Sequence, residues 1–119
     1  MCSSDLPDSF IQTPDGLLCD GVPVAAIADA VGTPAYVYSA RAVREAYGRL
    51  DEAFQGYPHR IHFALKANST LGLLRVLRAL GSHADANSVG ELQVAERAGF
   101  TPDQLVFTGV GKKIGRAHV

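Results

Sequence analysis

One lysine stands where an apolar stretch of the chain ends. Residues 61–65 are mostly apolar, as in a parallel strand buried on both faces, and Lys66 follows them directly. The carboxyl ends of such strands carry the ligand sites of open and barrel α/β folds, so a reactive side chain is expected here. Apolar neighbours would favour the neutral amine, which is the form that condenses with a carbonyl group. Spacing alone leaves a second reading open, in which Lys66 only marks the exit of the strand into water.

An aspartate has the corresponding position in the next expected strand. Asp85 lies near the end of the candidate strand 83–86, so we expect it to face the same opening as Lys66. An ordinary strand-end turn residue is the alternative. Ser88 and Glu91 have the spacing of a capping box, and we interpret them as a helix cap before we consider them as ligands.

Three weaker patterns indicate other chemistry. Residues 85–96 nearly match a calcium-binding loop, but Val89 offers no side-chain oxygen at a ligand position, and Gly81 and Ser82 interrupt the helix that should enter the loop. Residues 109–113 resemble the end of a phosphate-binding loop that lacks its first glycine. The histidines have no metal-ligand spacing, so no metal site is expected.

Alternating strands and helices must position Lys66 and Asp85. In the second half, strands are expected at 61–65, 83–86 and 105–108, and helices at 71–80 and 89–98. Each connection is long enough for a parallel βαβ unit. In the first half, turn dipeptides at 15–16 and 20–21 indicate a hairpin. A helix at 23–31, a β-rich run at 35–38 and a helix at 40–54 capped by Ser39 are expected to follow.

The composition excludes several classes of function. The 119 residues carry 11 basic and 12 acidic side chains, and this net charge of −1 gives no reason to expect a nucleic-acid surface or a polybasic membrane anchor. No apolar run approaches the ~18 residues that a membrane span needs, and no signal peptide is recognisable. Cys2 and Cys19 are too few for a disulfide framework or a four-cysteine zinc site. We therefore expect a cytoplasmic α/β protein.

Both ends of the chain read like translated sequencing adapters. We interpret residues 1–6 and 114–119 in this way and exclude them from the fold prediction. The expected organisation is then a lead-in over residues 7–38, with a hairpin, a helix and a strand, followed by β/α units over residues 39–113. Three parallel strands do not close a sheet, so we expect the opening section of a longer protein.

Three segments taken together resemble one family. Phe63–Asn68 (FALKAN), Ala84–Leu92 (ADANSVGEL) and Phe107–Lys112 (FTGVGK) are similar to the N-terminal part of pyridoxal-phosphate-dependent decarboxylases with an alanine-racemase-like barrel, and most similar to their diaminopimelate branch. The lead-in 20–38 is similar as well. One departure is Val89, where the family more often has glycine. The resemblance implies the first part of a pyridoxal-phosphate-binding (β/α)₈ TIM barrel, with an N-terminal strand that belongs to a β-domain.

The same resemblance implies a lyase of lysine biosynthesis. Its members decarboxylate meso-2,6-diaminopimelate to L-lysine and CO2 with pyridoxal 5′-phosphate. By position, Lys66 matches the lysine that binds the cofactor aldehyde, and Asp85 matches an acidic residue near the cofactor. Members are homodimers with shared active sites, so this chain alone is expected to be inactive.

Two alternatives stay open at this point. One is a decarboxylase of the same fold that acts on ornithine, arginine or carboxynorspermidine. The other is a non-catalytic pyridoxal-phosphate-binding barrel protein, although a lead-in toward a β-domain argues against it.

Overall fold

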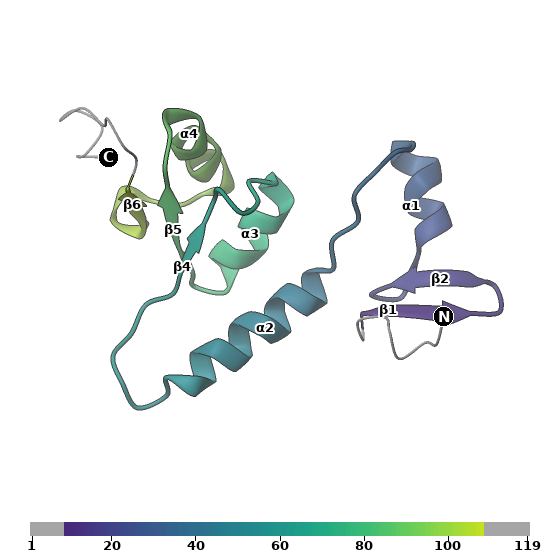
Figure 1. The fold of residues 1–119 in the computed structure, drawn as a ribbon, viewed down its shortest axis with the longest axis horizontal. Helices are drawn as coiled ribbons and strands as arrows, with labels where there is room; N and C mark the ends of the chain where they lie inside the picture. The colour runs from purple at the N-terminus through teal and green to yellow at the C-terminus, as the bar shows by residue number, and fades with distance from the viewer. Residues whose placement is uncertain (1–8, 109–119) are drawn as a thin grey trace. The chain divides into compact units, whose positions relative to one another are not determined.

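The computed structural model describes residues 9–108, and within them the chain divides into two units (Figure 1). The first unit ends at Ala46 and the second begins at Tyr47, so that the boundary falls inside helix α2 (Ala40–Ala53). The expected adapter-derived ends, residues 1–6 and 114–119, lie outside the described residues, as does the glycine-rich segment 109–113.

The first unit begins with the predicted hairpin. Strands β1 (Phe10–Thr13), β2 (Gly16–Cys19) and β3 (Val22–Pro23) form an antiparallel sheet in this order. The loop between β2 and β3 consists of Asp20 and Gly21, whose φ angles of 53° and 82° are both positive. These are the backbone angles of a type I′ turn, which Asp-Gly adopts readily. The turn dipeptides therefore marked this hairpin correctly.

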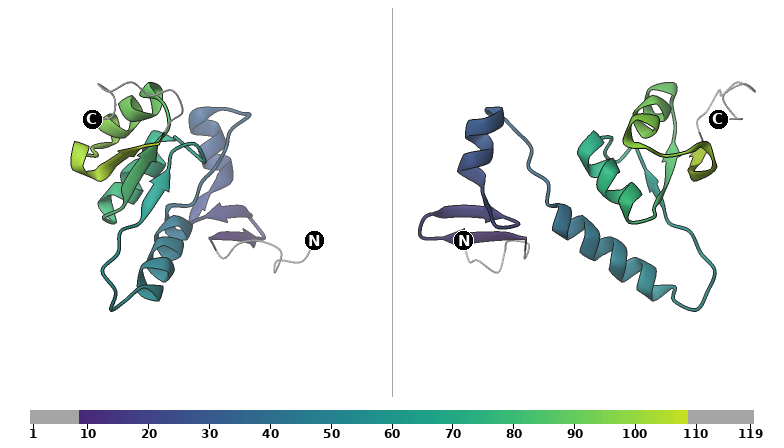
Figure 2. Two further views of the ribbon diagram at one scale, coloured as in Figure 1. Left: turned by 60° about the vertical axis from the view of Figure 1, so that its left-hand side comes forward. Right: turned by 180° about the vertical axis from the view of Figure 1, so that it is seen from behind.

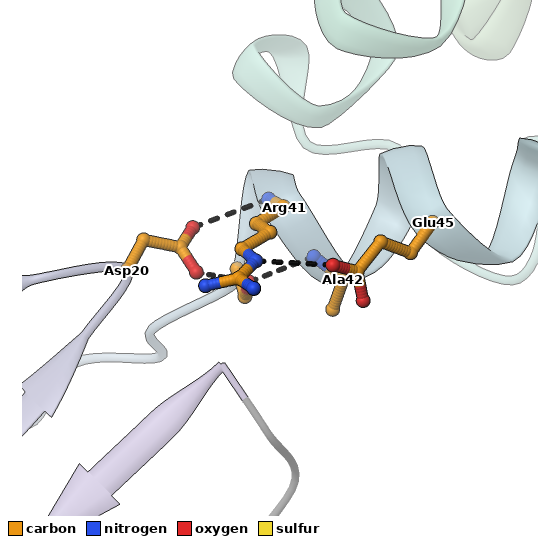
Figure 3. Close-up of polar contacts among 5 residues, drawn as sticks. Asp20, Arg41, Ala42 and Glu45 are labelled. Carbon is orange, nitrogen blue, oxygen red and sulfur yellow. Dashed lines mark hydrogen bonds and ion pairs between the residues drawn. The ribbon is translucent and has the colours of Figure 1, made fainter.

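The Asp20 turn also contacts the beginning of helix α2. The Ser39 hydroxyl accepts a hydrogen bond from the backbone N–H of Ala42 at 2.9 Å, as expected of an N-cap, and donates one to Asp20 Oδ1 at 2.7 Å. Asp20 Oδ2 accepts a further bond from the backbone N–H of Arg41 at 3.2 Å (Figure 3). Hydrogen bonds from Ser39 and Arg41 hold the pKa of the Asp20 carboxyl below its usual value. A carboxylate thus serves as a second cap for this helix.

The other helical prediction of the first unit is confirmed, whereas its last strand is not. Helix α1 (Val24–Val31) follows Pro23 and ends at Gly32, where φ is 82°. Residues 35–38 form no strand, although their composition is β-rich. A strand needs a hydrogen-bonded partner, and no segment between residues 9 and 108 pairs with this run. Tyr36 is consequently 90% exposed.

The second unit has the predicted alternation of strands and helices. Strands β4 (His62–Ala64), β5 (His83–Ala86) and β6 (Leu105–Phe107) form a parallel sheet in chain order. Helix α3 (Leu71–Ala79) connects the first two strands and α4 (Val89–Ala98) the last two (Figures 1 and 2). The prediction missed the short 3₁₀ turn η2 (Pro102–Gln104), although Thr followed by Pro is typical of a helix start.

The core of the second unit lies on one face of this sheet. Successive strand residues point to opposite faces, and in β5 the two alanines are fully buried while His83 and Asp85 are only half-buried. The small Ala84 and Ala86 let α4 approach the sheet closely. The prediction of burial on both faces is therefore wrong, because no element of the second unit up to residue 108 covers the second face. The buried apolar residues of this unit are Leu65, Leu74, Leu77, Ala84, Ala86, Leu92, Ala95, Ala98, Phe100 and Leu105.

We expect substitution of the glycine that ends α4 to destabilise the protein. Gly99 has φ 102°, and a Cβ atom built on it would lie 2.7 Å from Arg78 Nε. Gly99→Ala should lower the free energy of unfolding by about 1–2 kcal/mol, since a side chain is strained in this backbone region. Gly72→Ala on α3 is the matched control, because its Cβ meets nothing within 4 Å, and it should be stabilising by about 0.5–1 kcal/mol. Urea unfolding measures both, and equal midpoints for the two variants would contradict the assignment.

Candidate functional site

Lys66 lies at the carboxyl edge of the parallel sheet. Strand β4 ends at Ala64, and residues 65–67 form a turn. The backbone N–H of Leu65 donates to the Asp85 carbonyl at 3.0 Å, and the N–H of Ala67 donates to the Ala64 carbonyl at 3.1 Å. Leu65 is 1% exposed and anchors the turn in the core. The sequence therefore located Lys66 correctly in the fold.

The surroundings of Lys66 differ from the expected ones. Its side chain is exposed, whereas apolar neighbours were predicted around it. The flanking Leu65 points into the core, and within residues 47–108 no element covers the second face of the sheet. Within residues 9–108 the Lys66 amine forms neither a hydrogen bond nor an ion pair. It is a primary amine open to a reaction partner.

Asp85 lies at the same edge, on the neighbouring strand. The register pairs it with Ala64, two residues before Lys66, so that both side chains belong to the carboxyl end of the sheet, as predicted. Its Oδ1 atom accepts a hydrogen bond from the Thr108 hydroxyl at 2.8 Å. The same hydroxyl lies 3.0 Å from Asn87 Oδ1. The structure thus adds Thr108 and Asn87 to the site. Both lie in the family-like segments 84–92 and 107–112, and each directly follows a strand of the structure, which is the signal that could have found them.

A hollow of about 260 Å³ opens on the uncovered face of the sheet. His62, Asp85, Val106 and Thr108 line it. The His83 ring lies beside that of His62, with the ring centroids 5.2 Å apart and the ring planes inclined at 61°. A carboxylate, a hydroxyl and two imidazoles therefore meet at this face, and the accessible amine lies at its edge. This combination suits a small polar ligand with a carbonyl group.

Ser88 and Glu91 cap helix α4, as predicted. The Ser88 hydroxyl accepts a hydrogen bond from the N–H of Glu91 at 3.1 Å. Glu91 Oε1 accepts one from the N–H of Asn87 at 2.9 Å, one residue earlier than in the usual capping box. Both side chains are engaged in the cap and do not face the hollow. Val89 begins the helix without disturbing this arrangement.

The structure does not have the helix and loop that the calcium-loop pattern would require. Residues 83–84, which would end the entering helix, and residues 85–86, which would begin the loop, together form strand β5. Between residues 9 and 108 no three His, Cys, Asp or Glu side chains are grouped to hold a metal ion. Over the same range, the helices are too short or too polar to cross a membrane. Cys19 is a free, buried thiol.

Comparison with known proteins places these features in a family. Residues 40–117 match the pyridoxal binding domain of the pyridoxal-dependent decarboxylases. The chain is 45% identical over 105 residues to the diaminopimelate decarboxylase of Pseudomonas fluorescens, covering 88% of this chain and 25% of the relative. It is 45% identical over 106 residues to that of Vibrio cholerae, with the same coverage. The chain thus spans about a quarter of the length of these curated relatives.

Solved structures agree with this assignment. Diaminopimelate decarboxylase from M. jannaschii in complex with L-lysine superposes with a TM-score of 0.78 at 32% identity, covering 89% of this chain and 26% of the other. The Helicobacter pylori enzyme, also complexed with L-lysine, gives a TM-score of 0.68 at 41% identity, covering 76% of this chain and 23% of the other. The similarity therefore extends from the sequence to the fold.

His83 on the uncovered face should make stability depend on pH. Burial lowers the pKa of His83, and the positive charges of His62 and Arg60 lower it further, although Asp103 acts in the opposite direction. A histidine whose pKa is lower in the folded state binds its proton preferentially after unfolding, so stability falls as the pH drops through the unfolded value of about 6.5. His83→Gln should weaken this loss between about pH 7.5 and pH 5.5, as measured by urea unfolding.

His59 provides a control of opposite sign. Hydrogen bonds to the Tyr57 carbonyl and to Asp51 raise the pKa of His59. Its contribution is present below about pH 6.5 and is lost as the pH rises through the higher folded value. His59→Gln should therefore remove stability at the acidic end of the range. If both variants change the pH dependence in the same direction, the assignment of His83 is wrong.

Proposed function

The chain belongs to the pyridoxal-dependent decarboxylases, and from this premise we propose that it is the opening part of an enzyme that converts meso-2,6-diaminopimelate to L-lysine and CO2. One observation carries the proposal. An accessible amine, Lys66, follows β4 at the same sheet edge as the Asp85 carboxylate on β5. Two further facts support the substrate, namely the names of the relatives and the L-lysine in the M. jannaschii complex.

The residues of this edge fit pyridoxal 5′-phosphate. The cofactor requires a primary amine for its aldehyde, and the Lys66 amine is free of partners within the described residues. Lys66 would hold the cofactor through Nζ, and the Asp85 carboxylate would act from the same sheet edge. When bound, the cofactor supplies an electron sink for the carbon that loses CO2. This chain would contribute the Lys66 amine and the Asp85 carboxylate, both at the same edge of the sheet.

The organisation of the longer protein belongs to the same proposal. Residues 39–113 would form the first β/α units of its pyridoxal-binding barrel, and residues 7–38 would lead toward a β-domain. The unpaired, β-rich run 35–38 supports the second assignment, because it has no strand partner between residues 9 and 108. We further propose that the longer protein is cytoplasmic and that it forms a homodimer. Sedimentation of the longer protein would test the homodimer.

Substitution of Lys66 in the complete reading frame tests the activity. Lys66→Ala should reduce lysine formation from meso-diaminopimelate by about three orders of magnitude or more, since a nucleophilic amine is lost. Borohydride reduction followed by peptide mass spectrometry should find the cofactor on Lys66 in the parent alone. Arg75→Ala is the matched control, because it removes an exposed basic side chain from α3.

The outcomes separate the candidate substrates. The parent should prefer meso-diaminopimelate to ornithine, arginine and carboxynorspermidine when CO2 release is measured. Preference for one of these would replace the substrate and keep the chemistry. Cofactor trapped on a different residue would refute the role of Lys66, and trapping without any decarboxylation would favour a non-catalytic carrier.

The 119-residue chain alone should form no lysine. It spans about a quarter of the length of its relatives, and the described part of the second unit leaves one face of its sheet uncovered. An assay of the chain with pyridoxal phosphate and meso-diaminopimelate should therefore stay at the rate of a sample without protein. Lysine formation above that rate would show that these residues suffice.

A further inference from the structure

Thr108 connects the ends of two strands at the proposed site. Its backbone N–H donates to the Ala86 carbonyl at 3.1 Å, which extends the ladder between β5 and β6 by one residue. The register pairs Val106 with Asp85, and strand alternation then puts Thr108 on the same face as both. From this position its hydroxyl reaches back to Asp85 Oδ1 at 2.8 Å. Secondary structure thus fixes both ends of this contact.

The single hydroxyl proton of Thr108 decides the direction of the hydrogen bonds. Asp85 Oδ1 and Asn87 Oδ1 both lie within hydrogen-bond distance of Thr108 Oγ1, at 2.8 Å and 3.0 Å. One hydroxyl donates one proton, and an ionised carboxylate can only accept. The proton therefore goes to Asp85, and Asn87 is satisfied when its amide turns so that Nδ2 donates to Thr108.

The backbone of Asn87 is also hydrogen-bonded to the cap of helix α4. Its backbone N–H donates to Glu91 Oε1 at 2.9 Å, so the first turn of α4 fixes the position of the Asn87 backbone. A continuous series of hydrogen bonds then connects the helix cap, Asn87, Thr108 and the Asp85 carboxylate. Such a series restricts the rotation of the half-buried Asp85 side chain, which lines an open hollow where water would otherwise compete.

We infer that Thr108 is a positioning residue, whose hydroxyl holds the Asp85 carboxylate in one orientation at the sheet edge where Lys66 lies. The inference rests on the proposed function, since it assigns Asp85 to the cofactor site. Thr108 itself acts through Asp85, because its one hydroxyl proton is already donated to that carboxylate. The hydroxyl, and not the bulk of the side chain, carries the role.

Two variants of the complete reading frame separate the hydroxyl from the packing. Thr108→Val keeps the shape of the side chain and removes the donor, whereas Thr108→Ser keeps the donor. In the apo enzyme, borohydride trapping of pyridoxal phosphate on Lys66 should be about three- to ten-fold slower in Thr108→Val, the range expected for the loss of one hydrogen bond. Thr108→Ser should stay within about two-fold of the parent. The melting temperatures of the three apo proteins should agree.

The results also distinguish this inference from the proposed function. Equal trapping rates in Thr108→Val and the parent would overturn it, and so would a Thr108→Ser variant as slow as Thr108→Val. If the parent itself traps no cofactor, the proposed function fails. Crystal structures of the apo variants then decide, because Asp85 should keep a single orientation in the parent and Thr108→Ser and lose it in Thr108→Val. An unchanged Asp85 in Thr108→Val would refute the inference.

Discussion

The register of three parallel strands is the constraint on which the site depends. Backbone hydrogen bonds pair Ala64 with Asp85 and join Thr108 to Ala86, so the carboxyl ends of β4, β5 and β6 lie at one level. A shift by one residue would turn each side chain to the opposite face. Lys66 would then be separated from Asp85, although no residue had been changed. The backbone pairing of the strands therefore positions Lys66 and Asp85 at one edge of the sheet, independently of any side-chain contact.

The one-sided core follows from the same alternation. On β5 the alanines face the helices and the polar residues face the hollow, so a single four-residue strand serves both packing and chemistry. Membership in a barrel family explains this division, because in a barrel the helices cover the outer face and the strands' other side chains point inward. Polar side chains such as His83 are then expected on the inner face, next to the site.

Sequence patterns located most elements, and they did so best where local rules suffice. The Ser88 cap and the Gly99 stop bound α4 at the predicted residues, because both act through neighbouring backbone groups. The β-rich run 35–38 forms no strand within the described residues, because a strand also needs a partner distant in sequence. The prediction of apolar neighbours around Lys66 was wrong for a related reason, since burial depends on elements that are distant from Lys66 in the sequence.

The sequence by itself determined the element types, the family resemblance and the two candidates Lys66 and Asp85, because apolar spacing, caps and motif residues are local properties of the chain. Only the tertiary structure decided which groups meet Asp85. Thr108 is 23 residues away from it in the chain, and a hydrogen bond across that separation exists only once β5 and β6 are paired in register. The exposure of the Lys66 amine was decided in the same way, by which face of the sheet the helices cover.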